Sequence, residues 1–196
     1  MRFRIIASIL ALSLAGIAAA TPIKFTYTGT GSGALAGSAF SDAAFTITSF
    51  GDTDDRQSFS GGFSLDHISA TIDISGVGTF AFITATRTFV NNSIGVLGFS
   101  RAGVSLNDLY NGPSGGIDWD MLSDLGPVSG TFSLLQWALS PVIDTSGGVL
   151  AFTDSSGPGT FTATLTRDVP EPTTLWLMLA GMCGIALMMR RPIKST

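Results

Sequence analysis

Few side chains in this sequence could carry out chemistry. The chain contains one histidine, His67, and one cysteine, Cys183. A single cysteine forms neither an intramolecular disulfide nor a thiolate zinc cluster. His67 follows Asp66 in a strand-like segment, where neighbouring side chains point to opposite faces, so Asp66 is badly placed to orient the imidazole. No Gly-x-Ser-x-Gly pattern marks a nucleophilic serine. We therefore predict no catalytic residue and no enzymatic activity.

Carboxylates are the next candidates, and they gather in two places. The two groups are Asp52, Asp54 and Asp55, and Asp118, Asp120 and Asp124. Clustered carboxylates with backbone carbonyls can hold Ca²⁺, but neither group has the glycine and the final acid of a calcium loop. Aspartates in turns more often accept hydrogen bonds from their own backbone. No spacing selects two aspartates as the carboxylate pair of a glycoside hydrolase. We predict no metal site and no cofactor.

Aromatic residues offer a different kind of site. Tyr27, Tyr110, Trp119 and Trp137 could stack on sugar rings, or they could fill the core between strands. The first use would make the protein a carbohydrate-binding module with an aromatic face. The second would make these residues purely structural.

The segment that must position these residues, 21–168, has the composition of a β protein. It contains five cations and thirteen acids, all aspartate, which gives a net charge of −8. This charge disfavours nucleic acid as a partner. Glutamate is absent, and lysine and glutamine are scarce, so the usual helix formers are missing. Alternation of apolar and polar residues predicts half-buried strands. It runs through residues 23–28, 45–49, 68–74, 80–86 and 161–166.

Glycine, asparagine and aspartate mark the breaks between these strands. The pair Asn91-Asn92 suits a two-residue hairpin turn between strands at 79–90 and 94–100. We expect a loop or irregular edge at residues 29–37, and Trp119, Leu122 and Leu125 also fit a short helix over 117–125. Further turns are predicted at 51–55, 61–62, 111–116, 126–127, 144–148 and 154–159. Many short strands favour an antiparallel β-sandwich, with a jelly roll or β-barrel as the alternative.

The first 20 residues have the features of a secretory signal peptide. Arg2 and Arg4 precede an apolar run, which ends in small residues at Ala18 and Ala20. This is the pattern that a signal peptidase requires, and we predict cleavage after Ala20.

A second apolar run, of 17 residues without charge, lies at 173–189. As a helix it would span about 26 Å, close to the lower limit for crossing a bilayer. Arg190 and Arg191 follow, whereas Asp168 and Glu171 precede it. The positive-inside rule then puts residues 190–196 in the cytoplasm and the segment 21–168 outside.

The segment 169–172, Val-Pro-Glu-Pro, stands directly before this run. Two prolines keep it extended and deprive it of backbone donors. Pro170, Glu171 and Pro172, then one apolar helix, then Arg190 and Arg191 together resemble the PEP-CTERM sorting signal of Gram-negative bacteria. The resemblance implies recognition and removal of the signal by a membrane-embedded exosortase, and an association with exopolysaccharide. Residues 25–33 and 145–148 resemble further parts of PEP-CTERM proteins, without implying any activity.

Three regions follow from these observations: a signal peptide at 1–20, a β-sandwich at 21–168 and a sorting signal at 169–196. We expect an exported envelope or matrix protein whose partners are signal peptidase, an exosortase and exopolysaccharide. It would first cross the inner membrane once, with its domain outside, and then reach the envelope or the medium. A carbohydrate-binding module is the alternative function.

Overall fold

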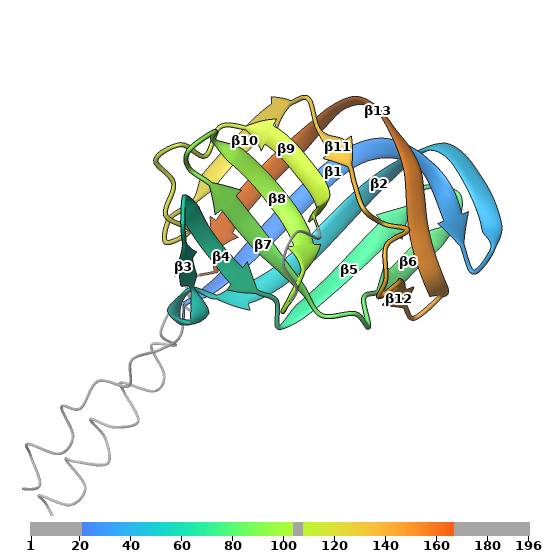
Figure 1. The fold of residues 1–196 in the computed structure, drawn as a ribbon, viewed down its shortest axis with the longest axis horizontal. Coiled ribbons are helices and arrows are strands. Elements are labelled where there is room, and N and C mark those ends of the chain that lie inside the picture. The colour runs from blue at the N-terminus through green and yellow to red at the C-terminus, as the bar shows by residue number, and fades with distance from the viewer. Residues whose placement is uncertain (1–20, 104–107, 167–196) are drawn as a thin grey trace, which may run out of the picture. The chain divides into compact units, whose positions relative to one another are not determined.

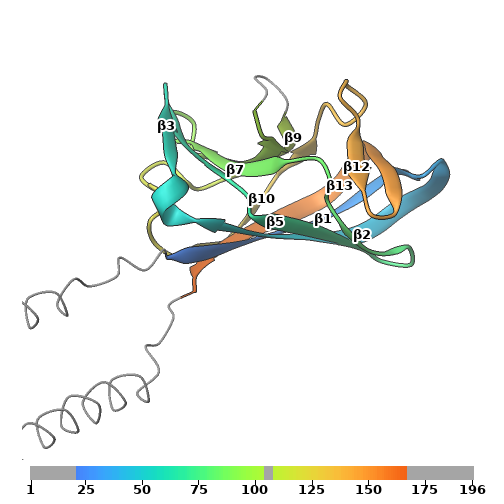
Figure 2. The same cartoon turned by 90° about the horizontal axis from the view of Figure 1, so that it is seen from below.

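A computed structural model describes residues 21–103 and 108–166, which form two antiparallel β-sheets. Figure 1 shows the smaller sheet in front of the larger one, and Figure 2 shows the two as separate layers. The predicted signal peptide at 1–20 and the predicted sorting signal at 169–196 lie outside the described residues.

The larger sheet has seven strands. In spatial order they are β10 (Leu125–Gly130), β13 (Gly148–Leu165), β1 (Pro22–Leu35), β2 (Ser38–Asp52), β5 (Ser69–Ile74) and β6 (Gly78–Ala81), with β12 (Ile143–Thr145) paired to β13. The smaller sheet has six strands. They are β11 (Ser133–Leu134), β9 (Asp108–Ser114), β8 (Val96–Arg101), β7 (Thr86–Asn91), β4 (Gly62–Asp66) and β3 (Gln57–Phe59).

The predicted antiparallel β-sandwich agrees with this arrangement, and the β-barrel alternative is wrong. Neither sheet closes on itself, so the structure is not a barrel.

Aromatic side chains fill the space between the two sheets. The Tyr27 ring on β1 lies 5.7 Å from the Phe99 ring on β8 and 5.1 Å from the Tyr110 ring on β9. Phe161 on β13 lies 4.9 Å from Tyr27. Aromatic pairs at these separations stabilise a core beyond the area that they bury. The sheets are therefore joined through rings from four different strands.

The predicted alternation is confirmed for most strands. Ile23, Phe25 and Tyr27 are completely buried on one face of β1, and Phe45, Ile47 and Ser49 are buried on β2. The segment 79–90, however, is not one strand. Its first part forms β6 in the larger sheet and its last part forms β7 in the smaller sheet. The chain crosses between the sheets at 82–85, which explains why the alternation weakens there.

Of the loop or irregular edge predicted at residues 29–37, the loop is wrong, because β1 continues to Leu35 and only Ala36 and Gly37 form a turn. The stretch is irregular, with shifts of pairing register between residues 28 and 33, but it lies inside the sheet between β13 and β2. The glycines of this stretch allow close packing. A Cβ at Gly31 would lie 2.8 Å from Leu134 Cδ1, and a Cβ at Gly33 would overlap the Ala151 carbonyl oxygen. Glycine is required here by the close approach of neighbouring strands rather than by a turn.

Three other predicted turns are also wrong, since residues 111–116, 126–127 and 154–159 lie wholly or largely within β9, β10 and β13. Glycines mark irregular positions in two of these strands. Gly126 and Gly157 have φ angles of +97° and +69°, and the pairing register shifts beside each of them. Such residues form β-bulges, which bend a strand without ending it.

The remaining turns are confirmed, with one difference of detail. Turns lie at 51–55, where Thr53–Asp55 forms the short helix η1, at 61–62 and at 144–148. The hairpin at Asn91-Asn92 joins β7 to β8, but its loop contains four residues. Gly95, with φ of +70°, supplies the left-handed conformation in this loop.

The short helix predicted over 117–125 is absent from the structure, which shows an irregular segment there. Asn92 Nδ2 lies 2.7–2.9 Å from the carbonyl oxygens of Gly116, Ile117 and Trp119, to which it donates. Trp119 is buried but Leu122 is 43% exposed, so the two do not share an apolar face. The side chain of Asn92, from the β7–β8 hairpin, therefore donates to carbonyl groups that would accept backbone hydrogen bonds in a helix.

Candidate functional site

The structure places His67 between β4 and β5, with its ring directed into the core. Its Nε2 lies 3.0 Å from Ser49 Oγ and 2.8 Å from Thr88 Oγ1, and its Nδ1 lies 2.9 Å from Thr86 Oγ1. The ring stacks on Phe99 at a centroid distance of 5.3 Å. Ser49 belongs to the larger sheet and the two threonines to the smaller one, so the imidazole bridges the sheets.

This bridge continues to Tyr27, whose hydroxyl lies 2.8 Å from Thr88 Oγ1 and 2.9 Å from the Gly98 carbonyl oxygen. Burial lowers the pKa of His67 to about 3, so the imidazole is neutral at physiological pH. Burial also raises the pKa of Tyr27 well above its ordinary value. The cluster is a satisfied buried polar network, of the kind that fixes how a core packs.

The geometry also shows what this Ser–His pair lacks. The Ser49 residue is completely buried, and the third polar partner of the ring is a threonine rather than a carboxylate. Asp66 is exposed and pairs in register with Arg87 on the outward face of the smaller sheet. A nucleophile–base pair needs a base that is held by a third group and a nucleophile that a substrate can reach. Thr86 holds the ring, but the second condition is not met, because Ser49 is completely buried.

The two aspartate groups accept hydrogen bonds from the backbone. Asp52 Oδ1 accepts from the Asp54 amide at 3.0 Å, Asp120 Oδ1 from the Leu122 amide at 3.0 Å, and Asp124 Oδ1 from the Leu165 amide at 2.6 Å. Within residues 21–103 and 108–166, no three His, Cys, Asp or Glu side chains lie close enough to hold a metal ion. Asp120 Oδ2 also lies 3.8 Å from Arg56 Nη1.

All four aromatic residues considered for sugar stacking are buried. Tyr27 and Tyr110 are 0% exposed, Trp119 is 5% exposed and Trp137 is 2% exposed. The indole nitrogens donate to backbone carbonyls, from Trp119 to Ser123 and from Trp137 to Leu109. An aromatic face made from these four residues is therefore wrong, and they are core residues.

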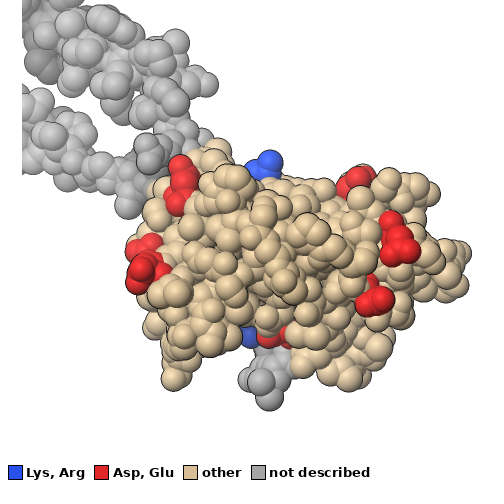
Figure 3. All heavy atoms as spheres, turned by 90° about the horizontal axis from the view of Figure 1, so that it is seen from above, with Lys and Arg blue, Asp and Glu red and all other residues tan. Residues whose placement is uncertain are grey.

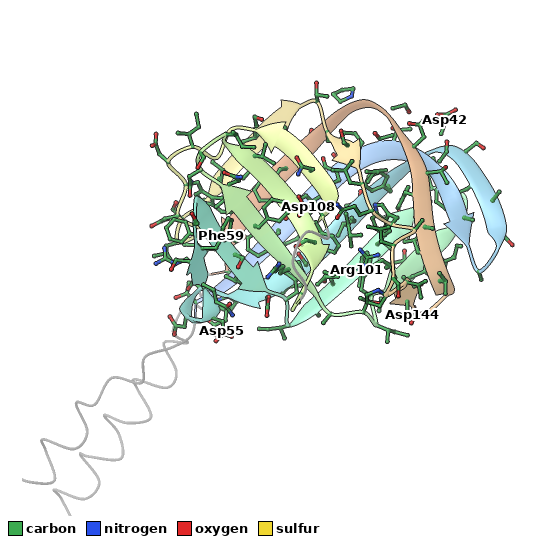
Figure 4. The ribbon with its side chains drawn as sticks, in the orientation of Figure 1. Asp42, Asp55, Phe59, Arg101, Asp108 and Asp144 are labelled. Carbon is green, nitrogen blue, oxygen red and sulfur yellow. The ribbon has the colours of Figure 1, made fainter. Side chains whose placement is uncertain are left out.

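A cleft that the sequence did not indicate lies on the outward face of the smaller sheet. Its volume is about 470 Å³. Its lining includes Phe59 from β3, Arg87 and Asn91 from β7, Ser100 from β8 and Asp108 from β9. Figure 4 labels Phe59 on β3 and Asp108 on β9, with three strands of this sheet between them. Nothing in the spacing of Arg87 and Asp108 along the sequence indicates that the fold brings them together.

Hydrogen bonds hold the polar groups of this cleft in place. Arg87 Nε donates to Ser100 Oγ at 3.1 Å, and Asn111 Nδ2 donates to Asp108 Oδ2 at 3.0 Å. Partial burial raises the pKa of Asp108, whereas the hydrogen bond from Asn111 and the charge of Arg87 act in the opposite direction.

Charge is sparse over the described surface. Figure 3 shows acidic side chains around the edge of one face, with a broad uncharged area between them. Within the described part of the chain, no helix is long and apolar enough to cross a membrane. The apolar run at 173–189 lies outside that part.

Comparison with known proteins identifies the C-terminal region. No curated protein and no solved structure matches the chain. Residues 168–191 match the family described as the PEP-CTERM protein-sorting motif. The match includes Pro170, Glu171, Pro172, Arg190 and Arg191, and it begins three residues after the last strand ends at Leu165. The chain therefore carries a C-terminal PEP-CTERM sorting motif, which supports export and sorting by an exosortase-type membrane enzyme.

Proposed function

We propose that this protein is a non-catalytic β-sandwich of the cell envelope or the extracellular matrix, associated with exopolysaccharide. The observation that carries the proposal is the sorting motif at 168–191, which follows a complete sandwich in the sequence. A motif of this kind serves delivery, so the sandwich is the part that acts after delivery.

The proposed route begins with the signal peptide at 1–20, cleaved after Ala20. The apolar run at 173–189 then stops transfer, with Arg190 and Arg191 retained in the cytoplasm. The segment Pro170, Glu171 and Pro172 would lie on the outer side of the inner membrane, where the membrane meets water. There it would be extended and accessible to a membrane-embedded protease. The exosortase would remove the run and release the sandwich to the envelope or the medium.

A non-catalytic role is supported by the state of the residues that could do chemistry. The single histidine is partly buried and neutral between hydroxyl groups, and Ser49 beside it is closed to solvent. Aspartates of both turn clusters accept hydrogen bonds from backbone amides. Association with polysaccharide is supported by the acidic, Ser- and Thr-rich composition of the segment 21–168, which suits a hydrated matrix.

Mass spectrometry of the intact protein from a strain that has an exosortase tests this proposal. We expect the mature form to begin at Thr21 and to lack residues beyond about 170, and to co-fractionate with exopolysaccharide. Recovery from that form of the tryptic peptide containing Trp176 contradicts the processing step. Fractionation that is unchanged in a strain without exopolysaccharide contradicts the association.

A further inference from the structure

We propose that the cleft on the outward face of the smaller sheet binds a neutral saccharide, with Phe59 stacked on a sugar ring and Arg87, Asn91 and Asp108 bonded to its hydroxyl groups. This inference rests on the proposed function in one respect, namely that the sandwich faces an exterior containing polysaccharide. It assigns the contact to particular residues, none of which belongs to the sorting signal.

Strand register brings the polar groups of the cleft together. Arg87 on β7 pairs with Ser100 on β8, and Ser100 pairs with Asp108 on β9. Directly paired residues of antiparallel strands project from the same face. The neighbouring residues Thr88 and Phe99 are buried, so this row projects outward. A guanidinium donor and a carboxylate acceptor thus lie on one face, with the single strand β8 between them.

A second row supplies the apolar surface. Phe59 on β3 pairs with Gly62 on β4, and Gly62 pairs with Asn91 on β7. The Phe59 ring lies over Gly62, 3.1 Å from where a Cβ would stand, and Phe59 remains 43% exposed. Its ring is therefore supported by the backbone beneath it and keeps an open side.

Two glycines make the face hollow. At Gly98 an added Cβ would overlap the ring of Phe89, so this ring lies flat across β8 and is only 9% exposed. Gly62 leaves the corresponding space under Phe59. The floor of the cleft is thus low and apolar, with polar groups at its sides, and its volume of about 470 Å³ lies in the range of ligand sites.

The chemistry of the cleft matches a sugar better than other ligands. Sugar hydroxyls both donate and accept, and here guanidinium donors, a carboxylate acceptor and an amide that does both face one space. The C–H face of a pyranose packs on an aromatic ring, as Phe59 offers. Asp108 beside Arg87, Asp66 nearby and a net charge of −8 for the segment 21–168 all oppose a polyanion. A neutral saccharide fits these conditions.

Affinity electrophoresis of the full-length protein in detergent tests the assignment. The gels contain neutral α-glucan, β-glucan, galactan or mannan, or an acidic polyuronate. We expect retardation by at least one neutral polymer and none by the polyuronate. Phe59→Ala should weaken the apparent affinity about tenfold, since stacking contributes roughly 1.4 kcal/mol. Arg87→Lys should also weaken it, because lysine keeps the charge but loses the planar fork of donors.

The matched control is Phe50→Ala. The exposed fraction of Phe50, 40%, is close to the 43% of Phe59, but Phe50 belongs to β2 of the larger sheet. Retention that is equal in both phenylalanine variants overturns the assignment, as does retention by the polyuronate alone or by no polymer. Mass spectrometry of Phe59→Ala separates the two proposals: the variant should be processed like the wild type. Normal processing without saccharide binding overturns the proposed saccharide site and leaves the proposed sorting route intact. Saccharide binding without processing overturns the sorting route alone.

Discussion

At the scale of single residues, His67 is the side chain that determines how the core responds to pH. It bridges the sheets through Ser49, Thr86 and Thr88, and all three partners are hydroxyl groups. A protonated imidazole in this place would need an acceptor at each nitrogen and a counter-charge, and no carboxylate is among its three partners. The residue is thus adapted to a neutral, packed state.

A pH dependence of stability follows from this environment. The pKa of His67 is about 3 in the folded protein and about 6.5 in an unfolded chain, so only the unfolded state takes up the proton between these values. The free energy of unfolding should therefore fall as the pH drops below 6.5. The His67 contribution should reach about 2–3 kcal/mol between pH 7 and pH 4.5.

Urea denaturation of the wild type and of His67→Gln at both pH values measures this contribution. His67 is the only histidine of the chain, so the difference between the two pH slopes isolates it from the aspartates. Parallel slopes would show that the imidazole is solvated in the folded state, contrary to the structure.

At the scale of elements, glycines decide where strands continue. Gly33→Ala should destabilise the protein by about 1–3 kcal/mol, because its Cβ would overlap the Ala151 carbonyl oxygen, which is backbone and cannot move aside. Thermal unfolding measures the loss. Gly130→Ala is the matched control in strand β10, since its nearest atom would be Pro113 Cβ at 3.2 Å. Equal losses in the two variants would mean that crowding is not the cause.

The irregular segment 115–124 depends on one side chain from the β7–β8 hairpin. Asn92→Ala removes the donor to three carbonyls and should cost about 1–3 kcal/mol, with faster amide exchange over residues 117–124. Hydrogen exchange with peptide-level resolution measures the local effect. Ser93→Ala, an exposed change in the same hairpin, should leave the exchange rates unaltered. Unchanged exchange in Asn92→Ala would show that the segment holds its shape without this residue.

At the scale of the whole molecule, delivery and the sandwich are separable. The sorting motif occupies 168–191, and the sandwich is complete at Leu165. Changes to the motif should therefore alter processing without altering the stability of the sandwich, and core changes should do the reverse.

Two sets of substitutions test this separation. Glu171→Ala should leave insertion intact but reduce cleavage, because only the extended Pro-Glu-Pro segment changes. Replacing both Arg190 and Arg191 by Ala should weaken retention and orientation, since the positive charges fix the cytoplasmic end. Intact mass and protease accessibility in cells measure the two effects. Wild-type processing in both variants would contradict recognition through these residues.

Much of this protein could be predicted from local sequence. The sorting motif is a linear pattern, so Pro170, Glu171 and Pro172 are identifiable without a fold. The sandwich class follows from period-two alternation, because burial of one strand face requires that pattern. The core positions Ile23, Phe25 and Tyr27 were predicted for the same reason.

Tertiary structure alone decided the rest. Glycine serves both turns and close packing, and only the position of Ala151 shows that Gly33 belongs to a strand. Trp119 and Trp137 could have faced solvent or core, and the tertiary packing buried them. The cleft joins Phe59, Arg87 and Asp108 from three strands through cross-strand register, which no local pattern encodes. Sequence determines what each segment prefers, whereas the meeting of distant strands determines which side chains share a site.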